Sequence, residues 1–248
     1  MATQPNAADT KVALVTGANK GIGREIARGL GRLGYVVLAG ARDEARGRTS
    51  AAELAAEEAD IRYLPLDVTV DETVRAAAKY VEEEFGRLDV LVNNAGISVE
   101  GQRPPHEITA EEVRRTMETN VIGVVAVIHA MLPLLRRSAA ARVVNLSTGL
   151  GSLGLLSDPD APPMGAQLLG YGSSKAALNA ITIMYAKDLA DDGIKVNSVS
   201  PGYCATDFTG NRGYRTAQQG AAVAVELATV GDEGPTGAFL NDDGPMPW

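Results

Sequence analysis

The sequence predicts an α/β fold with a doubly wound parallel sheet, and three observations lead to this prediction. Short apolar, β-branched runs alternate with longer segments of helical periodicity along nearly the whole chain, a pattern typical of repeated βαβ units. The 248 residues are 45% hydrophobic and 22% charged, a globular composition with enough apolar material for a substantial core. No fixed-period repeat, low-complexity tract or block of like charges interrupts the pattern, so a single domain is expected.

The apolar runs are expected to form the strands of this sheet. In chain order, the seven expected strands cover residues 12–16, 36–39, 61–66, 90–93, 142–146, 195–200 and 238–240. Parallel neighbours need long right-handed crossovers, so six helical segments are expected to connect the strands and to cover both faces of the sheet. These segments begin near Gly21, Asp43, Asp71, Ala110, Tyr171 and Thr216, and the fourth runs through Asn120, with a kink allowed, to Leu132.

The expected domain covers residues 11–248 after a tail at 1–10, with an insertion at about 149–170. The insertion is rich in glycine, leucine and proline. An irregular segment of this length inside a compact domain is usually functional or mobile, so a flap beside the substrate is favoured over a surface loop without a role.

Charge and cysteine content restrict the possible partners and the compartment. The formal net charge is −8, which argues against nonspecific binding to nucleic acid or to an anionic membrane and favours a small-molecule partner. Cys204 is the single cysteine, so no internal disulfide can form. No export or membrane signal is recognised, and a cytoplasmic location is therefore expected.

A glycine-rich loop follows the first expected strand. Thr16-Gly17-Ala18-Asn19-Lys20-Gly21-Ile22-Gly23 opens directly into a helical run. Glycines at these spacings let a pyrophosphate approach the backbone, while the helix N-terminus offers N–H groups and positive dipole. The loop therefore predicts a dinucleotide site, in which Gly17, Asn19, Lys20, Gly21, Ile22 and Gly23 contact the cofactor.

Basic residues near this loop favour NADP(H) over NAD. The second strand leads into Arg42 rather than into an acid that would bind the ribose hydroxyls. Arginine binds phosphate in a bidentate manner, so Arg42 and Lys20 together suggest a 2′-phosphate, although each alone can equally be a surface charge. Asp67, followed by Val68, ends the third strand, where it can bind an adenine amino group or equally well cap a helix.

Tyr171 and Lys175 are four residues apart in a segment of helical spacing, so they share one helix face. A nearby ammonium is expected to stabilise the phenolate and lower the pKa of Tyr171, which makes this residue a plausible proton donor. The spacing alone occurs often by chance, so the assignment depends on the other motifs.

With the glycine loop and the Tyr-x-x-x-Lys pair, the chain resembles the short-chain dehydrogenase/reductase family over about residues 11–243. The other motifs that carry this resemblance occur in the family's order, and their residues are Asn94, Ala95, Gly96, Asn120, Ser147, Thr148, Pro201 and Gly202. The resemblance implies a single Rossmann domain in which Tyr171 donates a proton, Lys175 binds the nicotinamide ribose, and Asn120 supports a water leading to the lysine. It also implies that Pro201, Gly202 and Thr206 lie beside the nicotinamide.

Within the family, the details look most like the carbonyl reductases, which implies NADPH as cofactor and a ketone, aldehyde or quinone as substrate. The alternatives left open are an NADP-binding sensor or scaffold with little turnover, and an alcohol dehydrogenase or ketoacyl reductase acting on another substrate class. No metal is needed for this chemistry, and neither a monomer nor a homodimer is favoured.

One position departs from the family pattern. The slot of the serine that polarises the carbonyl holds Thr148, and Ser147 precedes it. Threonine has the same hydrogen-bonding groups, so Thr148 is favoured for this role, with Ser147 as the alternative, since strand alternation turns adjacent side chains to opposite faces. We also expect residues 149–170 and 204–214 to form two flaps over the nicotinamide. The apolar pocket expected on this side is lined by Leu150, Leu153, Leu155, Leu156 and Met164.

Overall fold

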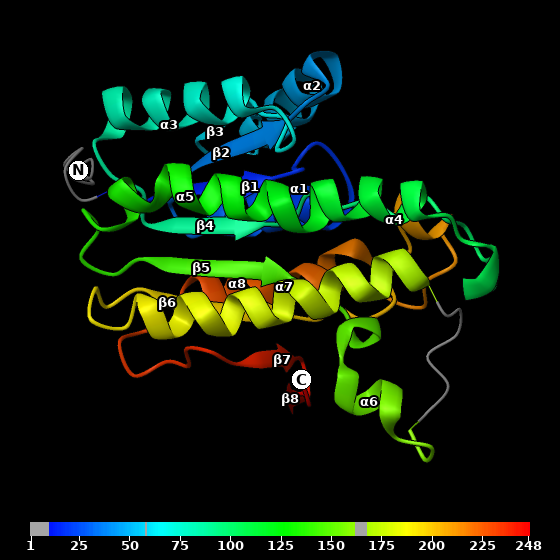
Figure 1. Cartoon of the computed structure of the whole chain (residues 1–248). Coiled ribbons are helices and arrows are strands. Elements are labelled where there is room, and N and C mark those ends of the chain that lie inside the picture. Colours follow the sequence, from blue (N-terminus) through cyan, green and yellow to red (C-terminus); the bar gives the residue numbers. More distant parts are fainter. Residues whose placement is uncertain (1–9, 58, 162–167) are drawn as a thin grey trace.

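The computed structural model describes residues 10–57, 59–161 and 168–248, and it contains one sheet with helices on both faces (Figure 1). The strands are β1 (Val12–Thr16), β2 (Val36–Ala41), β3 (Ile61–Pro65), β4 (Val90–Asn93), β5 (Arg142–Leu146), β6 (Lys195–Val199), β7 (Phe239–Asn241) and β8 (Gly244–Pro245). Their order in the sheet is β3-β2-β1-β4-β5-β6-β7-β8. All pairs are parallel except β7 with β8, so the predicted doubly wound α/β fold is confirmed.

The helices follow the predicted crossovers. They are α1 (Gly21–Arg32), α2 (Glu44–Ala55), α3 (Asp71–Phe85), α4 (Ala110–Met117), α5 (Gly123–Leu135), α6 (Leu153–Ser157), α7 (Leu169–Asp188) and α8 (Ala217–Ala228). Several begin at side chains that accept a hydrogen bond from the first turn, as Asp43 does for α2 and Thr216 for α8. These polar caps explain why the predicted starts of α2, α4 and α8 agree with the structure.

Two apolar cores hold the helices against the sheet. One core joins one face of the strands to α3, α5 and α7, which lie in front of the sheet in Figure 1, and it includes Leu14, Leu91 and Leu178. The other joins the opposite face to α1, α2 and α8 and includes Val15, Ile26 and Leu227. Consecutive residues of β1 therefore point into different cores, as strand alternation requires.

The strand order reverses between β1 and β4. The chain winds from β1 outward to β3, returns to β4 beside β1, and then continues in the other direction. In an open α/β sheet, ligands bind beyond the carboxyl ends of the strands at such a switch point. The loops that follow β1 and β4 meet there, and they carry the glycine loop and Asn94-Ala95-Gly96.

The structure corrects three details of the sequence prediction. The sheet has eight strands rather than seven, because residues 244–245 add a short antiparallel strand beside β7. The fourth helical segment is interrupted by a π-helical turn at Glu118–Ile122, which contains Asn120. The insertion is not wholly irregular either, since Gly149–Gly151 forms a 3₁₀ turn and α6 follows it.

One stretch of the described residues, 110–135, is long and apolar enough to cross a membrane by length and composition alone. It comprises α4, the π turn and α5, and 56% of its most apolar window is buried inside the protein. Most of the buried apolar residues of α5, among them Val127 and Ile128, belong to the core in front of the sheet.

Candidate active site

The glycine loop is tied to the loop after β4. The Asn94 side-chain amide donates to the carbonyls of Thr16 (2.8 Å) and Gly17 (3.1 Å), and the Thr16 hydroxyl accepts from the backbone N–H of both Asn94 and Ala95 (3.0 Å each). A Cβ at Gly23 would overlap with the Asn94 amide and lie 2.6 Å from the Gly17 carbonyl oxygen. Only glycine fits there, so this turn is built for close backbone approach.

The N-terminus of α1 presents positive charge above this turn. Lys20 is the N-cap residue, no side chain caps the helix, and its first turn holds no acidic residue. The first N–H groups of a helix have no intrahelical partner, so those of Gly21, Ile22 and Gly23 are available to an anion. The start of α1 therefore leaves N–H groups open to an anion, and the pyrophosphate site stays a prediction.

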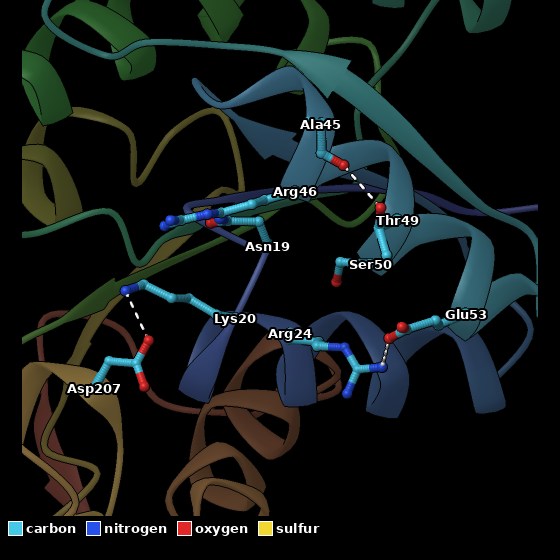
Figure 2. A pocket seen from close by; sticks show the side chains of 9 residues that line it. All are labelled: Asn19, Lys20, Arg24, Ala45, Arg46, Thr49, Ser50, Glu53 and Asp207. Carbon is cyan, nitrogen blue, oxygen red and sulfur yellow. Dashed lines mark hydrogen bonds and ion pairs between the residues drawn. The ribbon is translucent and has the colours of Figure 1, made fainter.

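A pocket of about 490 Å³ lies beside this helix start, between α1 and the first turns of α2 (Figure 2). It is lined by Asn19, Lys20, Arg24, Ala45, Arg46, Thr49, Ser50, Glu53 and Asp207. Lys20 pairs with Asp207 (3.0 Å) and Arg24 pairs with Glu53 (2.7 Å). The Ser50 hydroxyl is buried and has no hydrogen-bond partner among the described residues.

Two arginines that line the pocket, Arg24 and Arg46, were not among the predicted cofactor contacts. Arg46, in the first turn of α2, extends in the same direction as Lys20 in Figure 2. Arg42 is exposed at the end of β2 and does not line this pocket. The feature of the sequence that could have identified Arg46 is Asp43, three residues before it. As the N-cap of α2, Asp43 accepts a hydrogen bond from the backbone N–H of Arg46, which places the arginine on the first helical turn next to the glycine loop.

Asp67 and Val68 lie at the next strand end. The Asp67 carboxylate accepts from the backbone N–H and the hydroxyl of Thr69 (3.0 and 2.8 Å), which forms a turn before α3. The N-cap of α3 is Val70, so the capping alternative for Asp67 is wrong. Val68 is buried and packs against α5, where it leaves no room for a side chain at Gly123.

Tyr171 and Lys175 lie on adjacent turns near the start of α7, as predicted. The Lys175 side chain is 3% exposed, and its ammonium donates to the Leu146 carbonyl at the end of β5 (2.6 Å). The Lys175 nitrogen lies 5.7 Å from the centre of the Tyr171 ring. The two side chains therefore face one another across one helix face.

Asn120 completes this cluster from the π turn. It is fully buried and is held at three points, since its oxygen accepts from the Ile97 N–H (2.8 Å) and its amide donates to the Ile97 carbonyl and to Ser174 (2.9 Å each). A Cβ at Gly96 would lie 3.4 Å from the Asn120 oxygen and 3.6 Å from the Lys175 nitrogen. Gly96, Asn120 and Lys175 thus surround one small space.

Burial shifts the pKa values of both Tyr171 and Lys175. It raises the pKa of the Tyr171 phenol, so the expectation that the lysine lowers this pKa is wrong for the protein by itself. The reason is that desolvation disfavours the phenolate. Burial lowers the pKa of Lys175 to about 8, because the ammonium loses its hydration.

Thr148 and Ser147 lie at the end of β5, beside Leu146. Thr148 is half-buried, and its hydroxyl accepts from the Leu150 N–H (3.3 Å), so it retains a proton to donate. Ser147 is 3% exposed, and its hydroxyl has no partner in the described parts of the chain. Thr148 and Ser147 therefore both remain candidates for the group that polarises the carbonyl, and Thr148 is the more accessible of the two.

The segment after Pro201-Gly202 contacts both the glycine loop and Tyr171. A Cβ at Gly21 would lie 3.5 Å from the Thr206 methyl group, and Asp207 pairs with Lys20. The ring of Phe208 lies 5.2 Å from that of Tyr171. The structure thus brings the glycine loop with Lys20 close to Tyr171, and residues 206–208 contact both, whereas Arg42 does not line the pocket.

The described residues of the flap expected at 149–170 do not enclose an apolar pocket. Leu153 and Leu156 are 65% and 51% exposed, so they do not line a buried apolar pocket in this structure. Met164 lies outside the described residues.

Comparisons with known proteins agree with this arrangement. Residues 11–217 match the family model described as short chain dehydrogenase. The chain is 37% identical to short-chain dehydrogenase anuI of Penicillium roqueforti (96% of each chain) and 35% identical to carbonyl reductase [NADPH] 1 of Rattus norvegicus (97% and 99%). Among solved structures, the NADPH-bound carbonyl reductase from chicken fatty liver superposes with a TM-score of 0.85 at 29% identity, covering 96% of this chain and 99% of that one.

Proposed function

The chain belongs to the short-chain dehydrogenase family, and from this premise we propose that it is an NADPH-dependent reductase of ketone, aldehyde or quinone carbonyls. As a family member it is an NADP-dependent oxidoreductase with a Rossmann-type sheet. The observation that carries the carbonyl proposal is the cluster of half-buried Tyr171 with buried Lys175 and Asn120 beside the strand ends. The resemblance to carbonyl reductases across almost the whole chain supports the same substrate class.

The residues present fit an NADP(H) cofactor. The open N–H groups of α1 suit a pyrophosphate, and the unpartnered Ser50 hydroxyl and the cations Lys20 and Arg46 suit a 2′-phosphate. In this proposal, Asn94, Ala95 and Gly96 would hold the nicotinamide half of the cofactor together with Pro201, Gly202 and Thr206.

In the proposed reduction, four side chains have separate roles. When bound, the reduced nicotinamide supplies a hydride from its C4. The Thr148 hydroxyl donates to the carbonyl oxygen and polarises it, and Tyr171 gives that oxygen its proton. Lys175, held by the Leu146 carbonyl, keeps a positive charge beside the phenol, and Asn120 fixes the backbone at Ile97 next to it.

Burial raises the pKa of the Tyr171 phenol, so the protein by itself holds this group protonated at neutral pH. The same shift makes the phenol a weaker acid, and the positive charge of Lys175 beside it opposes that effect during proton transfer.

The proposed activity is tested by NADPH consumption with purified protein on quinones, aromatic aldehydes, cyclic ketones and β-keto esters, with NADH as the control. Turnover that depends on NADPH is the expected result. Cofactor binding without turnover on a broad panel would contradict the reductase and favour a sensor. Oxidation of sugar or steroid alcohols alone would favour a dehydrogenase.

We expect Arg46→Ala to weaken the binding of NADPH but not that of NADH. The variant removes a guanidinium from the proposed 2′-phosphate site, so the KM for NADPH should rise by about 10- to 100-fold while the KM for NADH hardly changes. Arg48→Ala is the matched control, because Arg48 is an exposed arginine of the same helix outside the pocket. Equal losses with both cofactors would contradict this assignment, and the same measurement on Arg42→Ala decides whether that residue contributes.

We expect Thr148→Val to lower kcat by about 10- to 100-fold, because it keeps the shape of the side chain but removes the hydroxyl that polarises the carbonyl. Thr148→Ser should retain activity, and Ser147→Ala should have a small effect. Steady-state kinetics at saturating NADPH checks this. A large loss confined to Ser147→Ala would move the role to Ser147.

A further inference from the structure

Glu100 is a buried carboxylate next to the catalytic helix. It is 2% exposed and lies in the loop between β4 and α4, 70 residues before Gly170. One of its oxygens accepts from the backbone N–H of Gly170 and the other from that of Tyr171, each at 2.7 Å. A charged group buried to this degree must be compensated, and here two backbone donors provide that compensation.

These two N–H groups are the ones that an N-cap side chain normally binds. The N-cap of α7 is Leu168, which offers no side-chain acceptor. Gly170 and Tyr171 occupy the second and third helical positions, whose N–H groups have no intrahelical partner. Glu100 therefore caps α7 from a distant loop, and its negative charge lies at the positive end of a helix of 20 residues.

The loop that carries Glu100 also holds two other parts of the site. Its Asn94 binds the glycine loop, and its Ile97 binds Asn120 through two backbone hydrogen bonds. Arg103 fastens the far end of the loop, since its guanidinium donates to the Glu100 carbonyl (3.0 Å) and pairs with Glu112 of α4. One loop thus fixes the glycine turn, Asn120 and the start of α7 relative to one another.

We propose that Glu100 is the positioning residue for Tyr171, which it holds through the backbone of the first turn of α7. This inference rests on the proposed function, because the hydroxyl of Tyr171 has to meet a substrate oxygen at a fixed distance. A small displacement of an acid relative to its substrate lowers the rate of proton transfer far more than it lowers cofactor affinity. Glu100 therefore acts on kcat without touching cofactor or substrate.

The test compares Glu100→Gln with the wild-type protein. Glutamine keeps one acceptor oxygen but presents an NH₂ group to the second N–H, so one of the two bonds is lost. Amide hydrogen exchange at Gly170 and Tyr171 should become at least about 10-fold faster. With NADPH, kcat should fall by about 10- to 100-fold while the Kd for NADPH changes less than about two-fold.

Asp89→Asn is the matched control. Asp89 is also buried, 6% exposed, and its carboxylate accepts from the Val12 N–H (2.8 Å), but it lies at the amino ends of β1 and β4, opposite to the carboxyl ends where the site is. This variant should lose stability without changing kcat or exchange at the start of α7. Glu100→Asp, which keeps the charge on a shorter side chain, should lie between Glu100→Gln and the wild type in both readouts, and it replaces Glu100→Gln if that variant does not fold.

Unchanged exchange at Gly170 and Tyr171 in Glu100→Gln would overturn the inference, as would a kcat loss no larger than that of Asp89→Asn, or one matched by a loss of NADPH affinity. Absence of carbonyl turnover by the wild type would contradict the proposed function instead. The exchange measurement still decides in that case whether Glu100 holds this turn.

Discussion

Tyr171→Phe should abolish carbonyl reduction, with kcat lowered by about 10²- to 10⁴-fold or more, because the variant removes the hydroxyl that protonates the substrate oxygen. The ring, its contact with Phe208 and its place on α7 are unchanged, so folding and NADPH binding should be retained. Steady-state kinetics together with NADPH titration checks both parts of this expectation.

Tyr185→Phe is the control for this variant, because Tyr185 is a half-buried tyrosine on the same helix, away from the cluster. It should be as active as the wild type. If Tyr171→Phe kept more than about a tenth of the wild-type kcat, another group would be the proton donor.

Lys175→Met should lower kcat by at least about 100-fold without an equal loss of stability. The substitution removes the ammonium beside the phenol, but it also removes the cost of burying a charge. With the pKa lowered from 10.5 to about 8, at roughly 1.4 kcal/mol per unit, this cost is about 3 kcal/mol below pH 8. Loss of the hydrogen bond to Leu146 offsets about 1 to 3 kcal/mol of that gain.

The pH dependence of stability follows from the same lowered pKa of Lys175. Between pH 8 and about 10.5, the unfolded state binds more protons at Lys175 than the folded state does, so this group makes the wild type more stable as pH rises. The free energy of unfolding of the wild type relative to Lys175→Met should therefore increase by about 2 to 3 kcal/mol from pH 7 to pH 10. Urea unfolding at both pH values measures this difference, and a constant difference would contradict it.

Activity should change in the opposite sense. The charged lysine is present below pH 8 and is lost as the pH rises through its pKa, so kcat/KM for reduction should decrease above about pH 8. A rate that rises across this range would place the working proton elsewhere.

The fold was predictable from the sequence because its determinants are local. The strands β1, β2 and β4 are buried, mostly apolar runs with clear boundaries, and capping residues such as Asp43 and Thr216 mark helix starts within three residues of the groups they bind. Strand β8 was missed because Gly244 and Pro245 have no strand-like pattern, and their pairing depends on β7.

The site was predictable where short motifs carry the chemistry, as in the glycine loop and the pair Tyr171 and Lys175. Two properties depend on tertiary packing and could not be read from the motifs. The direction of the Tyr171 pKa shift follows from burial rather than from the neighbouring lysine. Likewise, Glu100 reaches Tyr171 across 71 residues of sequence, in a loop whose pattern gives no sign of the contact.

The most direct test of the central proposal is reduction of an accepted ketone with NADPH that carries deuterium at the transferred position of the nicotinamide C4, followed by mass spectrometry of the product. The proposed hydride transfer predicts one deuterium on the carbon that bears the new hydroxyl group, in an amount equal to the NADPH consumed, and no labelled product with Tyr171→Phe. Unlabelled alcohol, or deuterium on another carbon, would contradict carbonyl reduction by this site.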